Sequence, residues 1–184
     1  MKNLERIRIR KALISDLPGI LSVVKNAFED MVFSDQSEEA LVKCLVNSTS
    51  FIPSLSIIAE HKKSIVGHIL LTRITIEDNN NGNSVPALAL APLAVEPIFH
   101  NKGIGSQLIK HAHSEALNLG YQSVIVVGDA NYYTRFGYRS ILEFNVDLPF
   151  DISKEHCLIL ELIPGTLDKI SGIAKYDKCF QTVP

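Results

Sequence analysis

The chain has 184 residues, which is close to the usual length of one domain and long enough to bury a substantial core. Its 18 lysines and arginines against 20 acidic residues give a formal net charge of −2, which excludes the strong positive charge typical of nucleic-acid and anionic-membrane binders. With 46% apolar and 21% charged residues, the composition indicates a folded globular protein and excludes a largely disordered one.

Short apolar runs and few cysteines narrow the class further. The longest apolar run, 87–95, has nine residues, whereas a membrane-spanning helix needs about 20. The start of the chain lacks the apolar centre of a signal peptide. The three cysteines form no CxxC pair, and their odd number argues against a disulfide framework, so we expect Cys44 and Cys157 to be buried. These features predict a soluble, cytoplasmic protein.

The N-terminal part predicts one strand followed by two helices. Apolar and charged residues alternate around Ile7, as in a half-buried strand. A helix capped by Ser15, with Pro18 in its first turn, then carries apolar residues on one face. A second, shorter helix starts after Asp35 or Ser37.

The middle of the chain predicts a sheet. Segments 56–60 and 65–77 are rich in β-branched residues, with a turn between them. An Asn-Gly pair marks a hairpin loop at 78–84. The near-continuous apolar run 87–95 is typical of a strand that is covered on both faces.

After Pro97 the apolar residues recur every three or four positions, which predicts a helix from Ile104 to Leu119 that Gly120 ends. The later segments predict a strand at 123–127, a short helix at 131–136, an extended segment at 138–148 and a last strand at 157–162. The tail after Pro164 carries no clear pattern. Strands and helices mix without a repeat or a linker, so the fold class is α/β or α+β in one domain.

A short glycine loop between the apolar strand and the next helix indicates phosphate binding. Gly103 and Gly105 lack Cβ atoms, so the backbone can approach a ligand closely. The N–H groups of the first helical turn and the positive end of the helix dipole favour a phosphate or pyrophosphate. Lys102 and His100 can add positive charge at the edge of the loop. The alternative is a glycine pair that only lets helix and strand pack tightly.

Two other phosphate-binding motifs fit this spacing less well. A P-loop needs Gly-Lys-Ser/Thr after four intervening residues, and the loop has none. A dinucleotide fingerprint needs a third glycine where Leu108 stands, although Asp129 lies near the expected acidic position. A nucleotide-binding oxidoreductase or transferase is therefore a weaker alternative, which predicts affinity for NAD or ATP.

Two linked segments resemble the GNAT superfamily of N-acetyltransferases. Residues 93–97 (LAVEP) and 100–105 (HNKGIG) are similar to the family's strand with a bulge and its Gln/Arg-x-x-Gly-x-Gly/Ala loop, with His100 at the Gln/Arg position. Residues 133–138 (YTRFGY) match the family's Tyr-x-x-x-Gly-Phe/Tyr element. Residues 128–137 are especially close to the YhbS-like bacterial branch. One helix and one strand separate the two matches, as in the family.

This resemblance implies a mixed, largely antiparallel central sheet flanked by helices. Residues 4–148 are then an acetyltransferase domain, and 149–184 add a C-terminal strand and tail to the same domain. The implied co-substrate is acetyl-CoA. Its implied contacts are Leu93, Ala94 and Val95 through their main chains, His100, Asn101, Lys102, Gly103, Ile104, Gly105 and Ser106 around the pyrophosphate, and Asn131, which either bonds the pantetheine arm or caps its helix with Asp129.

Acyl transfer to an amine needs groups that move protons and stabilise negative charge. The resemblance makes a main-chain N–H around Val95 the donor to the developing oxyanion. It makes Tyr133 the acid that protonates the leaving thiolate, since a phenol holds its proton at neutral pH; the alternative is a packing aromatic. Tyr132 is misplaced by one residue for this role. Glu96 and His68 are candidate bases, against the alternatives of a solvated loop carboxylate and a structural core histidine.

The predicted function is N-acetyl transfer from acetyl-CoA to a primary amine, by direct attack through a ternary complex. The alternative is a non-catalytic acyl-CoA-binding or sensor module. The expected acceptor is a small-molecule or peptide amine, no nucleic-acid or membrane partner is expected, and a homodimer is possible. No metal site is expected, because His111 and His113 lie two apart on a helix and point in different directions.

Overall fold

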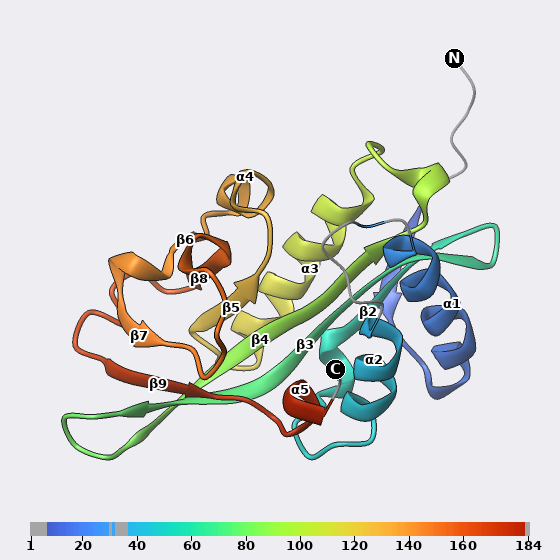
Figure 1. Cartoon of the computed structure of the whole chain (residues 1–184). Helices are drawn as coiled ribbons and strands as arrows, with labels where there is room; N and C mark the ends of the chain where they lie inside the picture. The colour runs from blue at the N-terminus through green and yellow to red at the C-terminus, as the bar shows by residue number, and fades with distance from the viewer. Residues whose placement is uncertain (1–6, 30, 32–36, 183–184) are drawn as a thin grey trace.

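The computed structural model describes residues 7–29, 31 and 37–182, and most elements follow the predicted order (Figure 1). The helices are α1 (Leu17–Phe28), α2 (Glu38–Leu45), α3 (Ile104–Asn118), α4 (Ala130–Tyr133) and α5 (Cys179–Thr182). The strands are β1 (Arg8–Lys11), β2 (Ser56–His61), β3 (Ser64–Asp78), β4 (Ser84–Val95), β5 (Ser123–Val127), β6 (Arg139–Ser140), β7 (Asn145–Asp147), β8 (Cys157–Glu161) and β9 (Ser171–Lys175).

The strands join one sheet that is mixed and largely antiparallel, as the resemblance implied. Its path runs β1-β2-β3-β4-β5-β8-β6, and β9 pairs with both β3 and β7. Only the β4–β5 and β7–β9 pairs are parallel among the strands of the described residues. The long β3–β4 hairpin crosses the whole molecule and carries the other elements on its two edges and faces (Figure 1).

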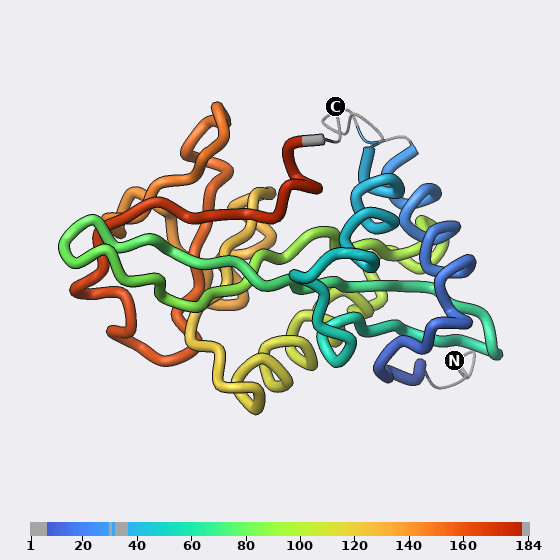
Figure 2. Tube along the Cα trace, turned by 90° about the horizontal axis from the view of Figure 1, so that it is seen from below, coloured from blue at the N-terminus to red at the C-terminus, as the bar shows by residue number. Residues whose placement is uncertain are grey.

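Helices cover both faces of this sheet (Figure 2). On one face, Leu108 of α3 packs with Ile57 of β2 in the largest hydrophobic cluster. On the opposite face, Val24 of α1 and Val42 of α2 pack with Ile58. Adjacent residues of a strand point to opposite faces, so the apolar pair Ile57 and Ile58 supplies both cores at once. That double burial explains why these strands lack a clear apolar–polar alternation.

The parallel strands β4 and β5 stay together for only a short distance. Their register covers Leu88–Leu90 against Val124–Val126. Beyond this point β4 continues to Val95 along β3, while β5 ends at Val127. Within the described residues, the β5-facing edge of 91–95 therefore has no strand partner, and this parting positions the candidate site.

The C-terminal part corrects one prediction. The strand at 157–162 is present as β8, but it is not the last strand. Residues Ser171–Lys175 form β9, which pairs antiparallel with β3 over Thr75–Asp78. This strand is short and contains one glycine and one lysine in five residues, so its sequence has too few apolar residues to stand out.

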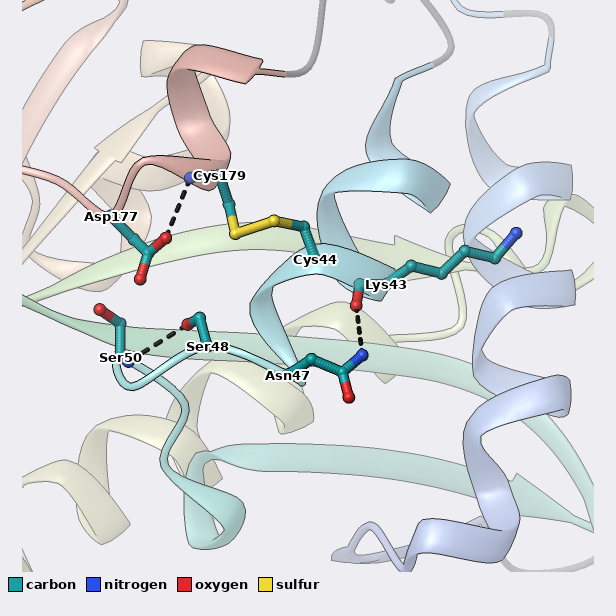
Figure 3. Close-up of a disulfide and its surroundings, with 7 residues drawn as sticks. All are labelled: Lys43, Cys44, Asn47, Ser48, Ser50, Asp177 and Cys179. Carbon is teal, nitrogen blue, oxygen red and sulfur yellow. Dashed lines mark hydrogen bonds between the residues drawn. A yellow bond between two sulfur atoms is a disulfide. The ribbon is translucent and has the colours of Figure 1, made fainter.

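The cysteines correct a second prediction, because Cys44 and Cys179 form a disulfide across 135 positions of sequence (Figure 3). The bond joins α2 to α5 beside the sheet. Asp177 supports the junction by accepting the backbone N–H of Cys179 at 2.9 Å. Neither spacing nor count of cysteines indicates a pair that only the tertiary fold brings together. Cys157 is buried with an unpaired thiol, as expected.

Smaller differences concern how elements begin and break. Helix α1 begins at Leu17, and Ser15 precedes it in a 3₁₀ turn instead of capping it. Helix α2 begins directly after Ser37, and Asp35 lies outside the described residues. The extended segment 138–148 is interrupted, because the 3₁₀ turn Ile141–Glu143 separates β6 from β7. None of the helices in the described residues is both long and apolar enough to span a bilayer.

Candidate functional site

A cavity of about 800 Å³ occupies the gap between the parted strands. Its floor is the end of β4 and β5, and the first turn of α3 and the α4 segment form one side. Helices α1 and α2 close the other end. The lining residues of β4 are Leu90, Ala91, Pro92, Leu93 and Val95; those of the glycine loop and α3 are His100, Asn101, Gly103, Ile104, Gly105 and Ser106; those after β5 are Gly128, Asp129, Tyr132, Tyr133 and Arg135.

The backbone of Val95 faces this cavity. In a strand, the N–H and C=O groups of successive residues point to opposite edges. The amide of Glu96 donates to the Val66 carbonyl in β3 at 2.9 Å, so the polar groups of Val95 point to the other edge, where β5 has left. By the same alternation Leu93 also faces the cavity, whereas Ala94 turns its backbone to β3 and is absent from the lining.

The start of α3 forms the expected cradle of backbone donors. Gly103 precedes the helix with a φ of 76°, a conformation that glycine adopts at no steric cost. No side chain caps the helix, so the N–H groups of its first turn stay available to a ligand. Asn101 also has a positive φ, of 60°, which asparagine tolerates better than most residues. These features fit an anionic group such as a pyrophosphate.

The two predicted cations of the loop are engaged elsewhere. His100 lines the cavity, but its Nε2 lies 2.8 Å from the Val95 carbonyl oxygen, so this nitrogen carries the proton and donates it there. Lys102 does not line the cavity. Its Nζ donates to the Ile98 carbonyl at 2.7 Å and lies 4.6 Å from the centre of the Phe99 ring.

Tyr133 lies where the cavity meets the core. Its side chain is 9% exposed and lines the cavity. Burial raises the pKa of its phenol above the usual value, and the neighbouring Tyr132 adds to this rise. The hydroxyl is therefore protonated at neutral pH and can act as a proton donor. Its ring contacts the ring of Tyr138, whose hydroxyl is 3.0 Å from Nε2 of His113.

Three other predicted residues lie off the cavity lining. His68 is fully buried in β3, where it faces the Ser56 hydroxyl at 3.0 Å, and burial lowers its pKa to about 3. Glu96 accepts a hydrogen bond from the Asn26 side chain at 3.0 Å. Asn131 is exposed, and Asp129 caps α4 by accepting its backbone N–H at 2.9 Å.

The opposite end of the cavity was missed by sequence reasoning. Phe28 of α1 and Leu41 of α2 give it apolar walls, and Glu38 adds a carboxylate. Nothing in the sequence signals that these residues reach the end of β4, because they belong to amphipathic helices whose packing on the sheet only the fold determines. Among the described residues, no three His, Cys, Asp or Glu side chains are grouped closely enough to hold a metal ion.

Sequence comparisons match this chain to acetyltransferases. A family profile described as an acetyltransferase (GNAT) domain matches residues 53–140. The uncharacterized N-acetyltransferase YjhQ of Escherichia coli K12 is 34% identical over 147 residues, which cover 78% of this chain and 80% of that protein. The uncharacterized N-acetyltransferase YhbS of the same strain is 22% identical over 172 residues, covering 94% and 97%.

Solved structures share the fold along almost the whole chain. The crystal structure of the GNAT family N-acetyltransferase YhbS from Escherichia coli, in complex with CoA, has a TM-score of 0.87 at 20% identity, covering 100% of this chain and 97% of that one. A GNAT family acetyltransferase from Brucella melitensis, in complex with acetyl-CoA, has a TM-score of 0.78 at 25% identity, covering 96% and 99%. The fold implied by the sequence resemblance is therefore confirmed.

Proposed function

The chain belongs to the GNAT family of acetyltransferases, and from this premise we propose that it transfers an acetyl group from acetyl-CoA to a primary amine by direct attack in a ternary complex. The observation that carries this proposal is that one cavity is lined by the first turn of α3, the open edge of β4 and the buried Tyr133. The bound co-substrate supplies an activated acyl thioester. A small-molecule or peptide amine is the proposed acceptor.

The residues present fit such a co-substrate. The uncapped first turn of α3 and the left-handed backbone at Gly103 offer donors to a pyrophosphate. The main chains of Leu93 and Val95 lie on the open edge of β4 and would hold the pantetheine arm. The Val95 N–H points into the cavity, so we assign it to stabilise the negative charge that develops on the thioester oxygen.

We assign Tyr133 as the acid that gives its Oη proton to the leaving sulfur. Burial raises its pKa, so the hydroxyl carries a proton at neutral pH, and the residue lines the cavity. Proton transfer by a positioned side chain contributes typically about 10²- to 10⁴-fold to a rate.

For the base we favour Glu96 over His68. Glu96 directly follows Val95 at the cavity and can reach an incoming amine through water, whereas His68 has no exposed surface. We assign His68 a structural role, because a fully buried, neutral imidazole bonded to Ser56 stabilises the strand pairing. The apolar walls from Phe28 and Leu41 favour the neutral form of the amine, since a charged amine would lose its solvation there.

The proposed function is tested by amine-dependent release of CoA from acetyl-CoA, across a panel of primary amines with tertiary amines as controls. We expect release with at least one primary amine, and initial-rate lines that intersect when both substrates are varied. Parallel lines would contradict direct attack, because they indicate an acyl-enzyme. CoA binding without turnover on any amine, and without an effect of Tyr133→Phe, would favour the sensor module instead.

A further inference from the structure

Arg135 is a cation on the cavity wall that the sequence motifs did not single out. It lies in the 3₁₀ turn Thr134–Phe136 that follows α4, lines the cavity and is exposed. Its guanidinium carbon is 4.5 Å from the centre of the Tyr132 ring and 5.5 Å from that of Phe136. Its Nε donates to the Tyr132 carbonyl at 3.1 Å, which fixes the plane of the guanidinium group.

Within the part of the chain that the structure describes, the two terminal nitrogens of Arg135 have no acidic partner. Among the described residues, no carboxylate forms an ion pair with it. Arg10, by contrast, pairs with Asp16 and Glu60, and Arg139 pairs with Glu161. A guanidinium fork that stacks on an aromatic ring and keeps its outer N–H groups is well suited to a phosphate.

Tyr132 ties this cation to the anion cradle. Its hydroxyl forms a hydrogen bond with the Ser106 side chain in the first turn of α3. It also lies against Gly105, where a Cβ atom would come closer to the hydroxyl oxygen than real Cβ atoms do. Gly105 thus makes room for Tyr132, and Tyr132 in turn carries the Arg135 guanidinium beside the cradle.

The glycine loop before α3 offers no side-chain cation to a ligand in the cavity. His100 stands where the family pattern has Gln or Arg, but its Nε2 donates to the Val95 carbonyl. Lys102 donates to the Ile98 carbonyl and does not line the cavity. Backbone N–H groups alone then face a strongly negative ligand from the loop side, so a cation from another element would complete the site.

We propose that Arg135 is this cation, that it binds a phosphate group of acetyl-CoA, and that Tyr132 is the residue that positions it. The proposal rests on the proposed function, since it concerns the same co-substrate. It assigns the charged part of cofactor recognition to α4 and the segment after it, instead of to the loop position that the family pattern would suggest.

The test measures the dissociation constants of CoA, 3′-dephospho-CoA and pantetheine for the wild-type chain, Arg135→Gln and Arg135→Lys. We expect Arg135→Gln to weaken CoA binding about tenfold or more, with a smaller loss for Arg135→Lys, and no change for pantetheine, which has no phosphate. A loss for CoA alone assigns the contact to the 3′-phosphate; a loss for CoA and dephospho-CoA assigns it to the pyrophosphate. Lys110→Gln, which removes an exposed charge from α3, is the matched control and should bind CoA normally.

Tyr132→Phe tests the positioning role. It keeps the ring under the guanidinium but removes the bond to Ser106, so we expect a loss for CoA of about two- to fivefold, on the scale of one net hydrogen bond. This loss should disappear when Arg135 is already glutamine and should be absent for pantetheine. If Tyr132 had only a structural role, the loss of affinity would also appear in the Arg135→Gln background and with pantetheine.

The outcomes separate this inference from the proposed function. If the wild-type chain does not bind CoA, the proposed function fails. If the wild type binds CoA and Arg135→Gln binds it equally well, the inference about Arg135 is overturned while the proposed function stands. A loss of equal size for CoA and pantetheine would also overturn it, because it would indicate general damage to the cavity.

Discussion

Tyr133 lies in the middle of a row of aromatic contacts, between Tyr132 and Tyr138. Its ring centre is 5.2 Å from that of Tyr132 and 5.4 Å from that of Tyr138, both edge-on. Tyr138 is held in turn by His113, which comes from α3. Such contacts restrict the orientation of the Tyr133 ring, whose side chain lines the cavity.

Replacing Tyr133 with Phe should lower kcat by about 10²-fold or more, because the leaving thiolate loses its proton donor. The affinity for CoA should change little, since the ring and its packing remain. The measurement is steady-state kinetics with the best primary amine. Tyr121→Phe is the control, because the Tyr121 hydroxyl accepts a bond from Arg73 outside the cavity lining. An unchanged kcat in Tyr133→Phe would remove Tyr133 from the mechanism.

His113 should make stability fall in acid. Burial lowers its pKa from 6.5 to about 4, so the folded chain binds fewer protons than the unfolded chain between these values. The neutral His113 side chain therefore costs no stability above about pH 6.5, and the free energy of unfolding falls as the pH drops from 6.5 towards 4. At pH 5 the loss is on the order of 2 kcal/mol. His113→Gln should therefore flatten the pH dependence of the free energy of unfolding, measured by denaturant titration.

The matched control for this prediction is His111→Gln, since His111 is exposed on the same helix. It should leave the pH dependence as it is in the wild type. His68, whose pKa burial lowers to about 3, adds a further loss in the same direction that both variants retain. Identical pH profiles for the wild type and His113→Gln would contradict the assignment of a buried, neutral His113.

At the scale of elements, the parting of β4 from β5 creates the site, and the sequence predicts its parts better than its shape. The apolar run, the glycine loop and the helix after it are local patterns, so their positions follow from periodicity and from Gly103. The end of the cavity lined by Phe28 and Leu41 is not predictable in this way, because these residues reach it only through the packing of α1 and α2. β9 and the disulfide could not be predicted from the sequence either, because both depend on contacts with distant segments.

The disulfide fastens the C-terminal helix to an element that lines the cavity. Cys44 lies one turn after Leu41 in α2, and both pack in a cluster with Cys179 and Phe180. Phe180 also contacts the rings of Tyr176 and Phe150. The position of α2, and with it the end of the cavity that Leu41 lines, is thus tied to the C-terminal segment.

Loss of this bond should lower the free energy of unfolding by about 2–5 kcal/mol, because it closes a loop of more than a hundred residues in the unfolded chain. Cys44→Ser and the wild type under a thiol reductant should show the same decrease in melting temperature. Cys157→Ser, which removes the unpaired thiol and keeps the disulfide, is the control: its melting temperature should fall with the reductant as the wild type's does, whereas that of Cys44→Ser should not fall further. A wild-type melting temperature that is insensitive to reductant would contradict the prediction.

At the scale of the whole molecule, the sheet joins distant parts of the chain around one cavity. We propose that residues 4–148 and 149–184 form a single domain, which is supported by the place of β8 beside β5 and of β9 beside β3. The lining of the cavity draws on α1, α2, β4, α3 and α4, which the sheet brings together from distant parts of the chain. A cytoplasmic location and a homodimer stay predictions.

The central claim is that this cavity binds CoA compounds, and a thermal-shift series with acetyl-CoA, CoA, NAD and ATP tests it most directly. A ligand at 100 times its dissociation constant stabilises the folded state by about 2.7 kcal/mol, which corresponds to a rise of several degrees in melting temperature for a chain of this size. We predict that acetyl-CoA and CoA raise the melting temperature and that NAD and ATP do not. A rise with NAD or ATP alone, or with none of the four, would contradict the account.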